Sequence, residues 1–182
     1  MEVLAQRLRD ANREIAVDAH CARFKGDTAS KLLEGVDIVL DATDSLQARL
    51  DIDRATYAAK LPWVMGAAVG TSGQWAAFDE ARREGCYHCL IREPDSSENQ
   101  GCAELGILGP VVGLVALHQS LLVIRYLVGA ALPHGDLHIL DAWTGENRQL
   151  ALAVCQDCVL CPEPSTQQSI SPKCAESAGH AR

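Results

Sequence analysis

Apolar and polar residues alternate along this chain with spacings that predict helices and strands in turn. The first 15 residues predict a charged amphipathic helix, with Val3, Leu4 and Leu8 on one face. Residues 15–20 alternate as a short strand does, and residues 28–34 are typical of a brief helix. The N-terminal part is therefore expected to hold two helices with a short strand between them.

The next part of the chain predicts a strand–helix–strand unit. Residues 37–42 and 63–69 are near-continuous apolar runs, typical of strands buried on both faces of a parallel sheet. Between them we expect a helix that Asp44 or Ser45 can cap and that ends before Pro62. Two such strands joined by a helix form a βαβ unit, so the sequence predicts an α/β fold with a Rossmann-like, doubly wound sheet.

The second half predicts further strands and a polar tail. Residues 74–78 are typical of a short strand, and residues 137–142 and 148–153 predict a hairpin that turns at Thr144 and Gly145. Residues 162–182 are rich in Ser, Pro and Gln, so we expect a disordered tail.

One segment is apolar enough to suggest a membrane span. It covers residues 106–132, but His118, Gln119 and Arg125 lie in its middle, where lipid would penalise them. We therefore expect a helix buried in the core or in a dimer interface, and no membrane association.

Composition narrows the class of protein. A chain of 182 residues can form one domain with a good core. Its net charge of −8, without any basic run, argues against nucleic-acid binding. Eight cysteines in a chain that starts with a charged helix rather than a signal peptide indicate metal or thiol chemistry in a reducing compartment. We expect a soluble, cytoplasmic protein.

Two Cys-x-x-Cys pairs predict a zinc site. The first pair is Cys86 and Cys89, and the second lies in a run where Cys155, Cys158 and Cys161 form two overlapping pairs. Four thiolates from two short turns suit zinc and leave no open position for water, which is typical of a structural site. Spacing alone does not choose between the overlapping pairs. His88 could be a ligand, although we expect a surface histidine; Cys21 and Cys174 are expected to have no role.

Two further residues are candidates for chemistry. Asp44 follows the strand at 37–42, where open α/β sheets place their ligands, and a carboxylate there suits magnesium. It could equally be a helix cap, while Asp41 is expected to order the end of the strand. Cys102 precedes the apolar helix, whose dipole would favour a nucleophilic thiolate, although Glu104 nearby opposes this.

Together these features resemble the ThiF/MoeB/HesA family, bacterial relatives of ubiquitin-activating enzymes. The matching segments follow the family's order and spacing and cover roughly residues 1–161. They are DIVLDATDSLQARLDIDRA (37–55), PWVMGAAVGTSGQ (62–74), CYHCLIREP (86–94), CAELGILGPVVG (102–113), LHILDAWTG (137–145) and DCVLC (157–161).

The resemblance implies an enzyme that uses ATP and magnesium to adenylate the C-terminal glycine of a ubiquitin-like sulfur-carrier protein. The acyl-adenylate is then converted to a thiocarboxylate for sulfur transfer of the molybdopterin or thiamine type. Family members are dimers, so a homodimer is implied. No rhodanese domain follows the second cysteine pair, and we therefore expect the sulfur donor to be a separate protein.

The resemblance also implies roles for single residues. Asp44, the last residue of a D-x-T-D motif, would contact the metal and the ATP phosphates, and Arg49 matches a family arginine on the following helix. Cys102 would attack or capture the activated carrier tail, or take part in sulfur transfer. The family site ends in D-C-x-x-C, which selects Cys158 and Cys161 as the second zinc pair.

One part of the family pattern has no counterpart here. The family's Gly-rich phosphate loop, its ribose-binding acid and its essential Arg and Lys lie upstream of Met1, and no replacement loop occurs in these 182 residues. We therefore expect residues 1–161 to be the C-terminal two-thirds of an adenylyltransferase domain, inactive alone. The alternative is a non-catalytic, zinc-stabilised module that binds a sulfur carrier or a full-length homologue.

Overall fold

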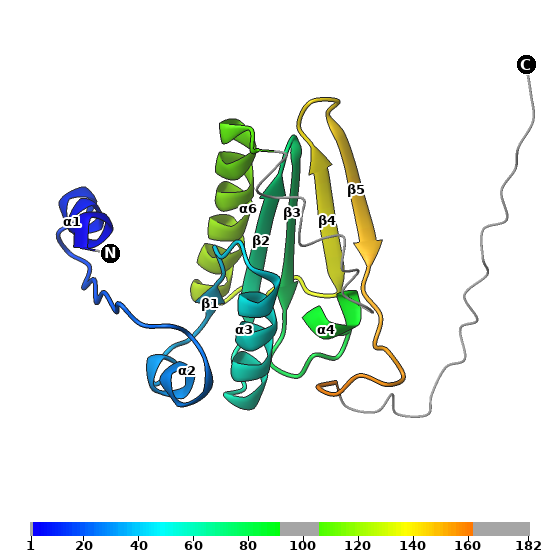
Figure 1. Ribbon diagram of the computed structural model, residues 1–182, viewed down its shortest axis with the longest axis horizontal. Coiled ribbons are helices and arrows are strands. Elements are labelled where there is room, and N and C mark those ends of the chain that lie inside the picture. Colours follow the sequence, from blue (N-terminus) through cyan, green and yellow to red (C-terminus); the bar gives the residue numbers. More distant parts are fainter. Residues whose placement is uncertain (1, 92–105, 162–182) are drawn as a thin grey trace, which may run out of the picture.

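A five-stranded mixed sheet forms the centre of the computed structural model, which describes residues 2–91 and 106–161 (Figure 1). The strands are β1 (Val39–Leu40), β2 (Trp63–Val69), β3 (Ser72–Phe78), β4 (Asp136–Asp141) and β5 (Glu146–Ala151), and they lie in this order across the sheet. β1 and β2 are parallel, whereas the other neighbours are antiparallel. The predicted βαβ unit and hairpin are therefore both confirmed, and the hairpin strands belong to the same sheet.

Helices cover both faces of the sheet. They are α1 (Glu2–Ala11), α2 (Gly26–Leu32), α3 (Leu46–Ala58), α4 (Tyr87–Leu90) and α6 (Gly109–Leu127). α3 joins β1 to β2 and packs against β2 and α4, while α6 packs against β2 and β3. Successive side chains of β2 face opposite sides of the sheet and pack into two hydrophobic clusters. On one side, Trp63 and Met65 pack with Ile52 of α3, and on the other, Val64 packs with Leu122 of α6.

Two strand predictions need correction. Residues 15–20 form no strand, and this stretch links α1 to α2 as extended chain (Figure 1). Its alternating pattern has no partner strand to pair with, and alternation alone does not form a sheet. The run at 37–42 forms only the two-residue strand β1, whose Leu40 is 43% exposed. Among the described strands β1 pairs with β2 alone, so it is an edge strand and is not buried on both faces.

A buried glutamine attaches α6 to the sheet. Its amide nitrogen, Gln119 Nε2, donates to the carbonyl oxygens of Asp41 (2.6 Å) and Val64 (3.3 Å), at the ends of β1 and β2. Gly66 makes room for this side chain, because a Cβ at Gly66 would lie 2.4 Å from Gln119 Cδ. The polar residue inside the apolar helix is therefore a structural anchor.

The outward side of α6 is apolar and exposed. The helix buries Val111, Val115 and Gln119, while Leu117, Leu121 and Ile124 are each more than half exposed. Within the described residues, α6 is the one helix whose length and composition would allow it to cross a membrane. The expectation of a helix buried in the core thus holds for one side of α6 only.

Candidate functional site

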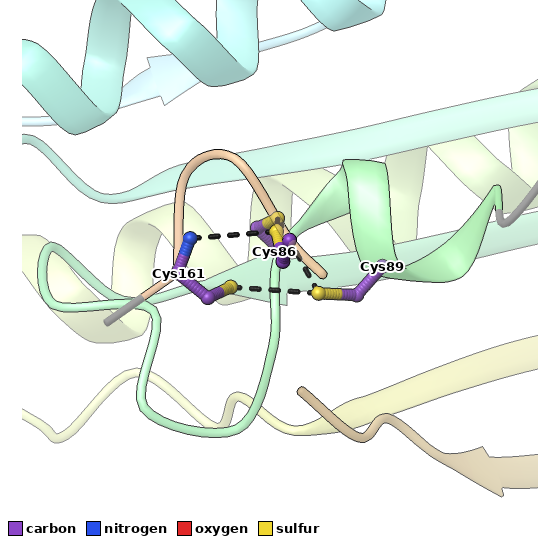
Figure 2. Close-up of side chains that lie close together, drawn as sticks. Cys86, Cys89 and Cys161 are labelled. Atoms are coloured by element: carbon purple, nitrogen blue, oxygen red, sulfur yellow. Dashed lines mark hydrogen bonds between the residues drawn. The ribbon is translucent and has the colours of Figure 1, made fainter. Parts of the chain in front are cut away.

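Four cysteine sulfurs gather from two parts of the chain, the start of α4 and the segment after β5. Cys86, Cys89, Cys158 and Cys161 place their Sγ atoms within 4.8 Å of one another. Three of the separations are 3.7 Å (Cys86–Cys89), 3.4 Å (Cys86–Cys158) and 3.5 Å (Cys89–Cys161). Figure 2 shows Cys161 and the pair Cys86 and Cys89 converging from two separate segments of the chain.

This arrangement fits a zinc ion. Tetrahedral Zn–S bonds of about 2.3 Å require sulfur separations of about 3.8 Å, close to those of the cluster. The backbone prepares the site as well, because Cys161 N–H donates to Cys158 Sγ at 3.4 Å. The four side chains could therefore hold a divalent metal with little rearrangement.

The thiols of the cluster differ in how readily they ionise. Burial and the nearby charge of Asp53 raise the pKa of Cys86, and burial raises the pKa of Cys161. Burial also acts to raise the pKa of Cys158, but the N–H groups of Cys161 and Leu160 outweigh it and lower that pKa to about 7. A divalent cation would supply the positive charge that favours all four thiolates.

The structure places Cys158 and Cys161, rather than Cys155, in the four-sulfur group. Cys155 instead lies against its edge, where its backbone N–H donates to Cys89 Sγ at 3.3 Å and its Sγ lies 3.4 Å from the Cys89 carbonyl oxygen. The grouping therefore agrees with the pair implied by the family resemblance. Cys21 is exposed and outside the cluster, and Cys174 lies outside the described residues.

A buried ionic network holds the first cysteine pair against α3. Asp53 of α3 and Arg82 have fully buried side chains, and Arg82 Nε donates to Asp53 Oδ1 at 3.1 Å. Trp63 Nε1 donates to the same oxygen at 3.2 Å. The other carboxylate oxygen, Asp53 Oδ2, accepts the backbone N–H of His88 at 3.3 Å and lies 2.9 Å from His88 Nδ1.

This network accounts for the position of the His88 side chain, which lies between the two cysteines of the first pair in the sequence. Its side chain is only 13% exposed and contacts Asp53, so the expectation of a surface histidine is wrong. Asp53, His88 and Cys86 also lie close enough together to hold a metal. However, Arg82 and Trp63 already occupy the Asp53 carboxylate, so we interpret this group as a structural network.

Asp44 lies in the loop between β1 and α3, with its side chain exposed. The cap of α3 is Ser45, whose hydroxyl accepts the N–H of Ala48 at 3.4 Å. Among the described residues no hydrogen bond or ion pair involves the Asp44 carboxylate. In the same part of the chain, the neighbouring Thr43 hydroxyl is buried without a hydrogen-bond partner. An available carboxylate beside an unsatisfied hydroxyl fits a bound magnesium–nucleotide.

Arg49 braces this loop from α3. Its guanidinium donates to Asp41 Oδ2 (3.2 Å) and to the carbonyl oxygens of Thr43 (2.5 Å) and Gly66 (3.3 Å). Asp41 is buried, and its other oxygen accepts the N–H of Thr43 at 2.8 Å. Asp41 thus orders the strand end, as expected, and the pair fixes the loop that carries Asp44.

The structure brings the predicted residues together in two places. Asp44 and Arg49 share the β1–α3 loop region, and the four cysteines share the cluster beyond α4. Cys102, the candidate thiol, lies outside the described residues. The Asp53–Arg82 network was not predicted, because its members are 29 residues apart and show no local pattern.

A parallel βαβ unit with an exposed carboxylate after its first strand, joined to a four-cysteine cluster, defines a Rossmann-like α/β protein with a group of thiols that could hold a metal. The chain belongs to the ThiF family, whose model matches residues 1–160. The family prediction is thereby confirmed.

Two relatives illustrate the match in sequence. The sulfur carrier protein ThiS adenylyltransferase of Escherichia coli is 34% identical over 161 residues, which are 88% of this chain and 63% of the relative. The molybdopterin-synthase adenylyltransferase of Salmonella typhimurium is 31% identical, over 88% of this chain and 65% of the relative. The chain thus spans just under two-thirds of the length of these proteins.

Solved structures agree on the fold. The crystal structure of E. coli MccB with ATP superposes with a TM-score of 0.70 at 16% identity, covering 88% of this chain and 50% of that one. A heterocyclase in complex with substrate and cofactor gives a TM-score of 0.55 at 16% identity, over 75% of this chain and 23% of that one. These likenesses confirm the predicted α/β fold class.

Proposed function

We propose that this chain takes part in the ATP-dependent adenylation of the C-terminal glycine of a ubiquitin-like sulfur-carrier protein. The relatives that match it are named as adenylyltransferases of sulfur-carrier proteins or of molybdopterin synthase. Residues 1–161 would form the adenylyltransferase domain, with residues 162–182 outside it. Magnesium–ATP would be the second substrate, and sulfur would come from a separate protein, for thiamine or molybdopterin-type chemistry.

The observation that carries this proposal is the available carboxylate of Asp44. It lies after the first strand of the βαβ unit, the usual ligand position of open α/β sheets. Ser45 caps α3, so the cap does not occupy Asp44. Arg49 and Asp41 fix the loop by hydrogen bonds, so the carboxylate can meet a magnesium ion with little loss of conformational freedom.

Three residue roles follow. Asp44 would bind magnesium and orient the ATP phosphates for attack by the carrier's carboxylate on the α-phosphorus. Arg49 would serve the nucleotide site by holding the loop and adding positive charge near the phosphates. Cys102 would be the thiol that meets the activated carrier tail. AMP makes the glycine carboxylate a far better acyl donor than it is alone.

The cysteine cluster would hold zinc in a structural role. Its four thiols leave no position for a substrate, and they join the chain after β5 to the segment before α4. The Asp53 network then connects this centre to α3, the helix that carries Arg49. Zinc would thereby stabilise the nucleotide side of the fold from a distance.

We also propose that the protein is a cytoplasmic homodimer. The exposed apolar residues of α6 form a surface suited to a second copy, and the buried Gln119 fixes the helix to the sheet. The net charge of −8 and the absence of basic runs argue against nucleic-acid partners. The anchoring of α6 to the sheet through Gln119 argues against α6 as a membrane span.

The proposal is tested by carrier-dependent exchange of labelled pyrophosphate into ATP. The 182 residues contain no G-x-G-x-x-G loop, so the assay uses the chain fused behind the preceding residues of the E. coli relative. We expect exchange that requires the carrier's terminal glycine and falls about 100-fold or more in Asp44→Asn, since the metal contributes several kcal/mol to the transition state. The matched control is Asp37→Asn, which changes an exposed carboxylate before β1 and should retain exchange.

A second candidate function is a non-catalytic module that binds the sulfur carrier. It predicts carrier binding by the chain alone and no exchange by the fusion. Exchange that persists in Asp44→Asn would instead remove Asp44 from the nucleotide site.

A further inference from the structure

The chain after β5 offers the metal centre a fifth thiol. Cys155, Cys158 and Cys161 are spaced three residues apart, so Cys158 belongs to two Cys-x-x-Cys pairs. Only Cys158 and Cys161 share the four-sulfur group with Cys86 and Cys89. Cys155 is half-buried and touches the group at Cys89, through its backbone N–H and through its sulfur.

The unused pair already has the turn that a pair of metal ligands needs. In the first pair, the N–H of Cys89 donates to the Cys86 carbonyl oxygen at 3.0 Å. The N–H of Cys158 donates to the Cys155 carbonyl oxygen at 3.2 Å, which closes a turn of the same length. The segment 155–158 therefore does not have to refold before both of its sulfurs can face one ion.

The position of Cys155 also suits an exchange of ligands. Its nitrogen lies 3.3 Å from Cys89 Sγ, so its backbone is already beside a ligand atom. Its sulfur donates to the Cys89 carbonyl oxygen at 3.4 Å, so the sulfur as well as the backbone of Cys155 lies beside the first cysteine pair. On the other side of Cys158, Val159 is 79% exposed, so little packing at that residue opposes movement of the link to Cys161.

We propose that Cys155 is an alternative zinc ligand that replaces Cys161, while Cys86, Cys89 and Cys158 stay bound. This inference rests on the proposed zinc site. In the exchange the Cys155 thiol gives its proton to solvent and forms a Zn–S bond, and the Cys161 thiolate leaves and takes up a proton. The ion keeps four thiolates and nothing is oxidised or reduced. The centre can thus retain its metal when Cys161 is modified.

Cobalt substitution tests the exchange, because the intensity of the thiolate-to-cobalt absorption counts the bound thiolates. We expect four thiolates in the wild-type chain, in Cys155→Ser and in Cys161→Ser, where Cys155 takes the vacant position. The double variant Cys155→Ser/Cys161→Ser should show three. Cys158→Ser is the matched control and should show three, because both pairs share that ligand.

The possible outcomes distinguish the exchange of Cys155 for Cys161 from the existence of the four-thiolate site itself. Three thiolates in Cys161→Ser beside four in the wild-type chain would overturn the role of Cys155 and leave the zinc site intact. Fewer than four in the wild-type chain would overturn the four-thiolate site, and the exchange with it. Neither result bears on adenylation, which the pyrophosphate exchange tests separately.

A second measurement needs no variant that lacks a ligand of the group. The zinc-loaded wild-type chain and Cys155→Ser are treated with iodoacetamide, and alkylation of Cys161 is followed by peptide mapping. If Cys155 replaces Cys161 on the metal, Cys161 should be alkylated several-fold faster in the wild-type chain than in Cys155→Ser, with zinc retained after modification. Equal rates in the two proteins would overturn the proposal.

Discussion

Replacing Asp53 by asparagine should destabilise the fold more than its small change in size suggests. The Asp53 carboxylate neutralises the fully buried guanidinium of Arg82 and accepts hydrogen bonds from Trp63 and from the backbone N–H of His88. Asparagine keeps the shape and one acceptor oxygen but removes the charge. Arg82 would then be a buried cation without a counter-ion.

The expected loss follows from that uncompensated charge. Removing one partner of a buried ion pair costs about 3–5 kcal/mol of unfolding free energy. Arg82 also donates to Thr56 Oγ1 at 2.7 Å and to the Asp79 carbonyl oxygen, so its charge cannot move to solvent without breaking further bonds. We therefore expect a loss in this range for Asp53→Asn.

Urea unfolding of the zinc-loaded protein measures the effect, with an unchanged slope as evidence that the unfolded state is the same. Asp51→Asn is the matched control on the same helix, because Asp51 makes only exposed contacts there, an ion pair with Arg54 at 3.7 Å and a hydrogen bond from Gln47 Nε2 at 3.0 Å. Its loss should stay below about 1 kcal/mol. In Asp53→Asn/Arg82→Met the stranded charge is gone, so the double variant should lose less than the two single variants add up to.

A loss in Asp53→Asn no larger than in Asp51→Asn would refute this reasoning. It would mean that the Arg82 guanidinium finds water or another acceptor, and that the network does not hold the first cysteine pair to α3. Additive losses in the double variant would show that the two side chains do not interact.

Three further predictions concern the rest of the fold. Removal of zinc by a competing chelator should lower the melting temperature sharply, since a structural metal contributes folding free energy; unchanged melting after verified metal loss would contradict this. Gly66→Ala should cost about 1–3 kcal/mol by pushing Gln119 off the sheet, whereas Gly113→Ala, with open space around its Cβ, should stabilise α6 by about 0.5–1 kcal/mol. The pKa of Asp141 should lie below its usual 3.8, because the N–H groups of Trp143 and Thr144 bond to its carboxylate. Its contribution to the hairpin is then present above about pH 4 and lost as the pH falls through the lowered pKa; an NMR titration that returns 3.8 or more would disprove it.

The sequence predicts the elements whose signals are local. β2 matches the apolar run at 63–69, and the hairpin follows from two strand patterns around a Thr-Gly turn. It overestimates β1, because an apolar run does not reveal how many neighbouring strands will cover it. Residues 15–20 show the same weakness, since alternation does not guarantee a partner strand.

The candidate site likewise has residues that the sequence reveals and supporting contacts that it does not. Two Cys-x-x-Cys pairs and an aspartate after a strand are visible as patterns, and the structure places them as expected. The contacts that hold these residues in place are not visible in the sequence, because Asp53 meets Arg82 and His88 only after folding. In the sequence Gln119 is only a polar residue that argues against a membrane span, and its contact with Asp41 is likewise a product of the fold.

The most direct test of the proposed function is to detect the adenylated sulfur carrier. The fusion with the preceding residues of the E. coli relative, which supply a phosphate loop, is incubated with magnesium–ATP and a sulfur carrier. The mass of the carrier is then measured by mass spectrometry. We expect an added AMP on the C-terminal glycine, absent with Asp44→Asn and absent from a carrier that lacks this glycine. An unmodified carrier, in the presence of a folded, zinc-loaded fusion that binds both ATP and carrier, would contradict the claim that this chain adenylates sulfur carriers.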